Sequence, residues 1–106
     1  MGNINTKEKY IISYTTNFKK QYKKIIKQGK DKTKLETVLN ILISGEKLPK
    51  KYRDHALINN KYFNNCRECH IEPDWLLVYK YNNDELNDEL ILYLIGTGSH
   101  TETLKI

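Results

Sequence analysis

The sequence predicts a small α+β fold in the order β-α-α-β-β-β, with a helical hairpin on one face of a mostly antiparallel sheet and a short C-terminal tail. Three observations predict it: apolar alternation near the N-terminus, two helix-period stripes after it, and three strand-like runs in the second half. With 106 residues and 12.6 kDa, two separate cores would each lie near the lower limit for stable folding. We therefore expect a single domain over residues 1–106.

The N-terminal half predicts one strand and two helices. Apolar residues alternate from about residue 8 to 14, which is typical of a short strand. A stripe at i, i+4, i+7 and i+8 then predicts a helix that begins at Thr16 or Asn17 and stops at Gly29. Asp31 can cap a second helix that ends at Ser44 and Gly45. The two stripes consist of Phe18, Tyr22, Ile25 and Ile26, and of Leu35, Val38, Leu39 and Leu42.

The C-terminal half predicts three strands. An irregular stretch over residues 50–61 precedes apolar runs at 63–71, 75–81 and 90–95. Pro73 indicates a tight turn between the first two runs. The string NDEL occurs twice in tandem over residues 83–90, and we interpret it as a lengthened hairpin loop, because a four-residue unit copied once builds no core.

The composition excludes some classes of protein and the charge distribution favours one class of partner. Hydrophobic residues make up 39% and charged residues 29%, which is typical neither of a disordered tail nor of a membrane protein. The first residues lack the pattern of a secretory signal, so we expect a cytoplasmic protein. Residues 1–61 carry fifteen basic and five acidic side chains, a charge of +10, whereas residues 62–106 carry −5. The basic half suits either a polyanion partner such as RNA or a solvated lysine-rich surface.

The string CRECH over residues 66–70 matches the attachment motif of c-type haem, and its ligands also suggest zinc. Cys66 and Cys69 fall on opposite faces of the predicted strand, which suits neither two thioethers to one haem nor one zinc ion. His55 or His100 would have to complete a zinc site, since the usual second pair of ligands is missing. We therefore expect no metal and no cofactor, and no disulfide in a cytoplasmic protein.

The three histidines suggest general acid/base chemistry. Hairpin geometry brings His70, Asp74, Trp75 and residues 96–100 to one end of the predicted sheet. Histidine exchanges protons near neutral pH, and RNA can be cut without a metal when a base activates the 2′-hydroxyl and an acid protonates the 5′-oxygen. Trp75 suits either stacking on a base or a place in the core.

Three strings resemble the signature of YafQ-type toxins, which belong to the RelE/ParE superfamily of bacterial toxin–antitoxin systems. They are YRDHAL over residues 52–57, CRECHIEPDWLLVY over 66–79 and GSH over 98–100. The resemblance runs from about residue 7 to 104, and the RelE-like fold of that family is the β-α-α-β-β-β order predicted above.

The resemblance implies a metal-independent, ribosome-dependent endoribonuclease that cleaves mRNA and is neutralised by a cognate antitoxin. It also implies that the basic helical face contacts the ribosome. His70 and His100 would form the acid/base pair, His55 and Asp74 would position or polarise the phosphate, and Trp75 would contact the substrate base or shape the pocket. Further substrate contacts would come from Lys51, Arg53, Arg67 and Leu104.

The chain departs from the family pattern at two positions. Gly96 stands where family members usually carry an arginine, and Leu104 stands where they tend to carry phenylalanine. An arginine at this position can stabilise the charge on the phosphate, so its loss predicts weakened cleavage. Arg67 or Lys51 would have to supply the missing positive charge. The alternative functions are a non-catalytic ParE-like toxin that binds gyrase, or a small metal- or haem-binding protein.

Overall fold

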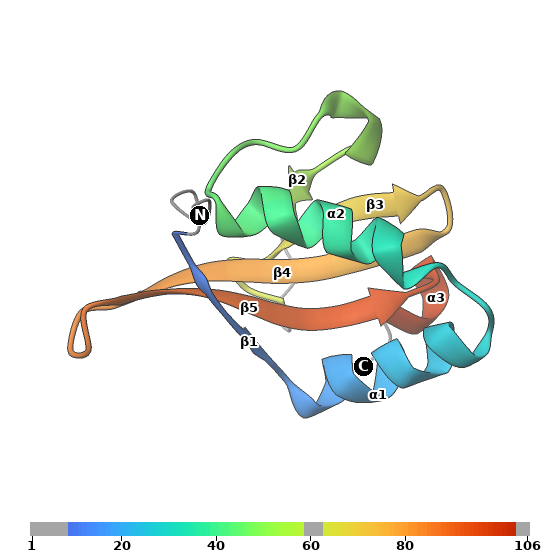
Figure 1. The fold of residues 1–106 in the computed structure, drawn as a ribbon, viewed down its shortest axis with the longest axis horizontal. Helices are drawn as coiled ribbons and strands as arrows, with labels where there is room; N and C mark the ends of the chain where they lie inside the picture. Colours follow the sequence, from blue (N-terminus) through green and yellow to red (C-terminus); the bar gives the residue numbers. More distant parts are fainter. Residues whose placement is uncertain (1–8, 59–62, 104–106) are drawn as a thin grey trace, which may run out of the picture.

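A five-stranded sheet forms the centre of the molecule in the computed structural model, which describes residues 9–58 and 63–103 (Figure 1). Its strand order is β1-β5-β4-β3-β2, with β1 parallel to β5 and every other pair antiparallel. The predicted α+β fold is therefore confirmed. The strands are β1 (Ile11–Tyr14), β2 (His55–Ala56), β3 (Arg67–Glu72), β4 (Trp75–Asp84) and β5 (Glu89–Gly98).

The two predicted helices are α1 (Thr16–Lys27) and α2 (Lys32–Ile43). Helix α1 is capped by Thr15, one residue earlier than predicted, because the Thr15 hydroxyl accepts a hydrogen bond from the backbone N–H of Phe18 at 2.9 Å. Asp31 caps α2 as predicted. Gly29 follows α1 with φ +91°, a conformation that glycine adopts without steric cost. None of the described helices is long and apolar enough to cross a membrane.

The main core lies between these helices and one face of the sheet. Side chains of β4 alternate, so that Trp75, Leu77 and Tyr79 face the helices while Leu76 and Val78 face away. Both predicted stripes reach this core. Its buried members are Phe18, Ile25, Leu35, Val38, Leu42, Cys69, Ile71, Trp75, Leu77, Tyr79, Leu92 and Leu94.

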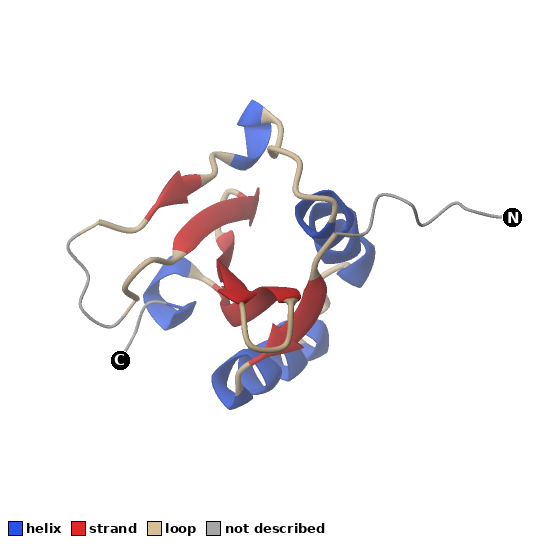
Figure 2. Ribbon diagram, turned by 90° about the vertical axis from the view of Figure 1, so that its left-hand side faces the viewer, coloured by secondary structure: helices blue, strands red, loops and turns tan. Residues whose placement is uncertain are grey.

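The opposite face of the sheet, called the open face below, is covered only in part. Helix α3 (His100–Thr103) contacts β4 and β5 there, and it lies across the sheet from α2 (Figure 2). A second apolar cluster forms on this face around Phe63, Cys66 and Val78. The region of the open face that carries β2 and β3 remains available for polar side chains.

The predicted strand boundaries need three corrections. Residues 63–66 form a turn, so β3 begins at Arg67 and not at residue 63. The segment predicted to be irregular contains the 3-10 helix η2 (Lys50–Tyr52) and the two-residue strand β2, which pairs with β3. Strands β4 and β5 extend through half of the tandem NDEL copy, which leaves a turn of residues 85–88. Strand β2 is too short, and the added ends of β4 and β5 are too polar, for an alternating pattern to reveal them as strands.

Candidate active site

The open face holds a cluster of His55, Glu68 and His70, called the open-face cluster below. His55 pairs directly with Glu68 across β2 and β3, and His70 lies two residues further along β3 on the same face. The Nε2 atom of His55 is 3.2 Å from Oε1 of Glu68, and Nε2 of His70 is 3.8 Å from the same oxygen. The two imidazole rings lie 6.3 Å apart. One carboxylate therefore faces two histidines.

Both ring nitrogens of His55 have oxygen neighbours. Its Nδ1 atom lies 2.8 Å from the carbonyl oxygen of Arg53, and its Nε2 atom faces the Glu68 carboxyl group. These two contacts hold the ring in one orientation. His70 has the same arrangement at longer range, with Nδ1 3.4 Å from the carbonyl oxygen of Pro73. His70 is therefore held less tightly than His55.

Glu68 is the buried member of the cluster. Its side chain is only 4% exposed, and its Oε2 atom has no hydrogen-bond partner among the described residues. A buried carboxyl group is costly to leave without polar partners, and the two imidazoles are its nearest ones. This arrangement can hold a proton on either imidazole and release it to a substrate.

His100 lies on the same face but apart from the cluster. It is the exposed first residue of α3, which follows directly on β5. His70, Leu76 and Gly98 form one row across β3, β4 and β5, which corresponds to about 10 Å between His70 and Gly98. A substrate phosphate would therefore have to lie between His70 and His100 to contact both.

Asp74 and Trp75 differ in their access to solvent. Asp74 is exposed in the turn between β3 and β4, near His70. Trp75 is completely buried, and its Nε1–H donates to the Thr97 hydroxyl at 3.0 Å. The predicted contact between Trp75 and a substrate base is therefore wrong for this structure, because the ring has no free face. Trp75 is a core residue on the helix-facing side of the sheet, behind the open face.

Arg67 also departs from its predicted role. Its side chain lies on the helix-facing side of β3, where its Nη2 atom donates to Oδ2 of Asp54 at 3.0 Å. The hydroxyl of Tyr79 donates to the other oxygen of Asp54 at 2.5 Å. The Asp54 carboxylate raises the pKa of Arg67, and burial together with Asp54 raises the pKa of Tyr79. Arg67 is thus already paired with Asp54, and it lies on the face of the sheet opposite to the histidines.

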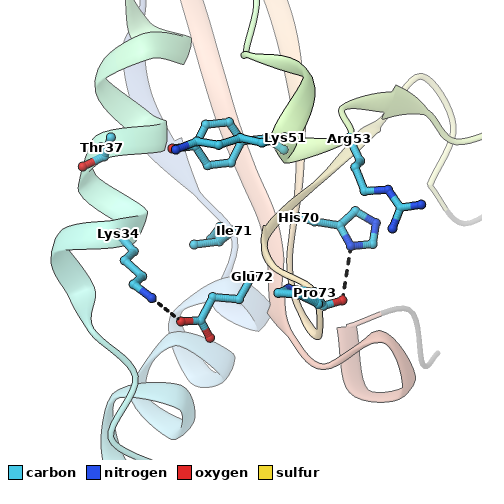
Figure 3. Close-up of a pocket in the computed structure, with 9 residues that line it drawn as sticks. Lys34, Thr37, Lys51, Arg53, His70, Ile71, Glu72 and Pro73 are labelled. Carbon is cyan, nitrogen blue, oxygen red and sulfur yellow. Dashed lines mark hydrogen bonds and ion pairs between the residues drawn. The ribbon is translucent and has the colours of Figure 1, made fainter.

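A hollow of about 440 Å³ opens beside His70, between α2, η2 and the end of β3 (Figure 3). Figure 3 shows the Arg53 side chain extending alongside the His70 ring, while Lys34 reaches the Glu72 carboxylate. Lys51 lies over the ring of Tyr52, with its Nζ atom 5.1 Å from the ring centre. The hollow thus presents several cations next to the open-face cluster.

Gly96 lies in a crowded position. A Cβ atom there would be 2.7 Å from Oε1 of Gln21 and 3.5 Å from a methyl group of Thr103. The same Gln21 oxygen accepts a hydrogen bond from the backbone N–H of Thr97 at 2.9 Å. A long cationic side chain at residue 96 would displace these contacts. The predicted contact of Leu104 lies outside the described residues.

The two cysteines lie on opposite faces of the sheet, as predicted, with Cys66 directly before β3 and Cys69 within it. Cys66 packs in the apolar cluster on the open face, whereas Cys69 lies in the main core. Burial raises the pKa of both thiols, so neither is a thiolate at neutral pH. Within residues 9–58 and 63–103, no three His, Cys, Asp or Glu side chains are placed so that they could hold a metal ion.

Sequence reasoning missed the central role of Glu68. The signal was present, because strand alternation places Cys66, Glu68 and His70 on one face. What the sequence lacked was β2, which brings His55 to the other side of Glu68.

Comparison with known proteins identifies the family to which the chain is similar. The family model described as "Bacterial toxin of type II toxin-antitoxin system, YafQ" matches residues 10–105. The mRNA interferase toxin YafQ of Escherichia coli BL21-DE3 is 37% identical over 90 residues, which cover 84% of this chain and 89% of that protein. The crystal structure of the E. coli DinJ–YafQ complex has a TM-score of 0.73 at 34% identity and covers 88% of this chain and 96% of that one. A metal-bound toxin from Helicobacter pylori has a TM-score of 0.74 at 34% identity, with 88% and 97% covered.

Proposed function

This chain belongs to the YafQ family of bacterial toxins from type II toxin–antitoxin systems, and we propose that it is an mRNA interferase that cuts ribosome-bound mRNA. The observation that carries the proposal is the open-face cluster, in which one buried carboxylate holds two imidazoles. Such a cluster suits proton transfer near neutral pH better than it suits binding alone.

The proposed reaction is an internal transesterification. A base removes the proton from the 2′-hydroxyl, the 2′-oxygen attacks the adjacent phosphorus, and the bond from phosphorus to the 5′-oxygen breaks as an acid protonates that oxygen. The products are a 2′,3′-cyclic phosphate and a 5′-hydroxyl. His70 and His100 serve as the acid/base pair, because His70 is loosely held and His100 is exposed.

His55 and Asp74 support this pair. The contacts of His55 with the Arg53 carbonyl and with Glu68 fix the orientation of its ring, which can then donate to the reacting phosphate. Asp74 lies at the exposed turn next to His70, where its carboxylate can orient that imidazole or a bound water. Glu68 holds the two imidazoles on the same face of the sheet.

The reaction as proposed needs no metal, so a chelator should leave cleavage unchanged. A related H. pylori toxin is described as metal-bound.

The proposed partners are the ribosome and a cognate antitoxin. Helix α1 presents five exposed lysines and no acidic residue, which suits contact with ribosomal RNA. A related toxin is found in a complex with DinJ, which supports an antitoxin for this chain. A cytoplasmic location follows from these partners. The lysines of α1 are Lys19, Lys20, Lys23, Lys24 and Lys27.

A reconstituted translation reaction tests the proposal. Purified protein should stop synthesis and leave cuts in the ribosome-bound message, whereas His70→Gln and His100→Gln should each cut at least about 100-fold more slowly. Glu85→Gln, which removes an exposed charge in the turn between β4 and β5, serves as a control that should cut normally. Intact mRNA with the unmutated protein would contradict the proposal, and inhibition of gyrase with intact mRNA would favour the ParE-like alternative.

A further inference from the structure

We infer that Arg53 is the cation that stabilises the reacting phosphate, and that its backbone conformation places it beside the open-face cluster. The inference rests on the proposed function, since it assigns a residue to the charge that develops in that reaction. Arg53 differs from the other cations near His70 in its backbone, in its neighbours and in its freedom from ion pairs.

The backbone of Arg53 is in the left-handed region, with φ +51° and ψ +41°. A residue with a side chain adopts this conformation less readily than glycine, because its Cβ atom crowds the following carbonyl oxygen. The Arg53 N–H closes η2 by donating to the carbonyl of Lys50 at 3.0 Å, and its carbonyl oxygen accepts from Nδ1 of His55. The conformation therefore links the position of the Arg53 side chain to the orientation of the His55 ring.

The side chain of Arg53 lines the same hollow as His70 and extends alongside its ring (Figure 3). Within the described ranges, no ion pair engages the Arg53 guanidinium. The neighbouring cations are already occupied: Lys30 and Lys34 bind the Glu72 carboxylate at 2.9 and 2.6 Å, and Lys51 lies over Tyr52. Arg53 and Lys51 can both turn to a ligand without breaking an ion pair, and of the two it is Arg53 whose side chain lies alongside the His70 ring (Figure 3).

The proposed reaction needs a positive charge beside the phosphate. Glu68 brings a negative charge to the site, and a phosphate gains further negative charge as the 2′-oxygen attacks. A guanidinium can donate two parallel hydrogen bonds to the non-bridging phosphate oxygens, which a lysine cannot do. Gly96 supplies no cation and Arg67 faces the helices, so these positions cannot provide the charge.

The test compares Arg53→Asn and Arg53→Lys with a matched control, Lys34→Gln, which removes a charge from the same hollow. Asparagine tolerates the left-handed conformation, so Arg53→Asn removes the charge while it spares the backbone. In single-turnover cleavage of ribosome-bound mRNA, we expect Arg53→Asn to be slower by about 100-fold or more, Arg53→Lys to be intermediate and Lys34→Gln to stay within about threefold. Ribosome binding by Arg53→Asn should stay within about twofold of that of the unmutated protein.

A second readout does not depend on cleavage. The His70 ring signals in an NMR titration with inorganic phosphate report binding at the site, and Arg53→Asn should weaken that binding at least about tenfold. Absence of cleavage by the unmutated protein would refute the proposed function, whereas the phosphate titration would still test the inference. Equal phosphate binding by both proteins, or no phosphate-dependent shift in the unmutated protein, would overturn the role of Arg53. An equal loss of ribosome binding and cleavage would identify Arg53 as a ribosome contact, and that result would also overturn its role at the phosphate.

Discussion

Asp54 joins β2 to the rest of the sheet, and replacing it with asparagine tests how His55 is held in place. Its carboxylate accepts hydrogen bonds from Arg67 at 3.0 and 3.2 Å and from the hydroxyl of Tyr79. Tyr79 is 1% exposed, so its hydroxyl would lose a charged acceptor with little water to replace it. A hydrogen bond to a charged group contributes about 1.5–3 kcal/mol, and the partly exposed ion pair adds less than about 1 kcal/mol.

We therefore expect Asp54→Asn to lower the free energy of unfolding by about 2–3 kcal/mol, measured by urea denaturation at pH 7. The matched control is Asp88→Asn in the exposed β4–β5 turn, which should change it by less than about 0.5 kcal/mol. Adding Tyr79→Phe to Asp54→Asn should cost less than the sum of the two single changes, because both weaken the same interaction. Strict additivity, or an Asp54→Asn protein as stable as the unmutated one, would refute the anchoring role.

Three further predictions concern charge, thiols and packing. The two lysine partners of Glu72 lower its pKa, so its contribution to stability is present above its ordinary value of 4.5 and is lost as the pH falls through the lowered pKa. Glu72→Gln should therefore reduce the free energy of unfolding by up to about 1 kcal/mol at neutral pH, and the difference should vanish in acid; a difference independent of pH would exclude this cause. Burial raises the pKa of the Cys66 and Cys69 thiols, so iodoacetamide should label the unfolded chain at pH 8 much faster than the folded protein. Gly96→Ala should cost about 1 kcal/mol by displacing Gln21, and this cost should fall when Gln21 is already alanine; an unchanged cost would mean that another contact is responsible.

The sequence predicted the elements whose residues repeat at a clear period. The stripes that contain Phe18 and Leu35 reach the core, and the alternation of β3 places Cys66 and Cys69 on opposite faces. The Asp31 cap is also local, since its side chain bonds a backbone N–H only two residues away. Such features depend on neighbouring residues and can therefore be read without a structure.

The features that escaped prediction depend on contacts between distant segments. Strand β2 has two residues and no pattern of its own, and it exists because it pairs with β3. Without it, nothing in the sequence joins His55 to Glu68. Trp75 suits a core and a binding site equally well by residue type, and only the fold shows it bonded to Thr97 and buried. The left-handed conformation of Arg53 gives no signal, because arginine rarely adopts it.

The most direct measurement of the central claim places a single 2′-deoxynucleotide on the 5′ side of the cleaved bond in a ribosome-bound mRNA. The histidine mechanism requires the 2′-oxygen of that nucleotide as the nucleophile, so the modified message should stay intact at that bond while neighbouring bonds remain sensitive. The unmodified message should yield a 2′,3′-cyclic phosphate end. Cleavage of the deoxy-substituted bond at the normal rate would contradict the claim, because it would show that water or another nucleophile attacks the phosphate.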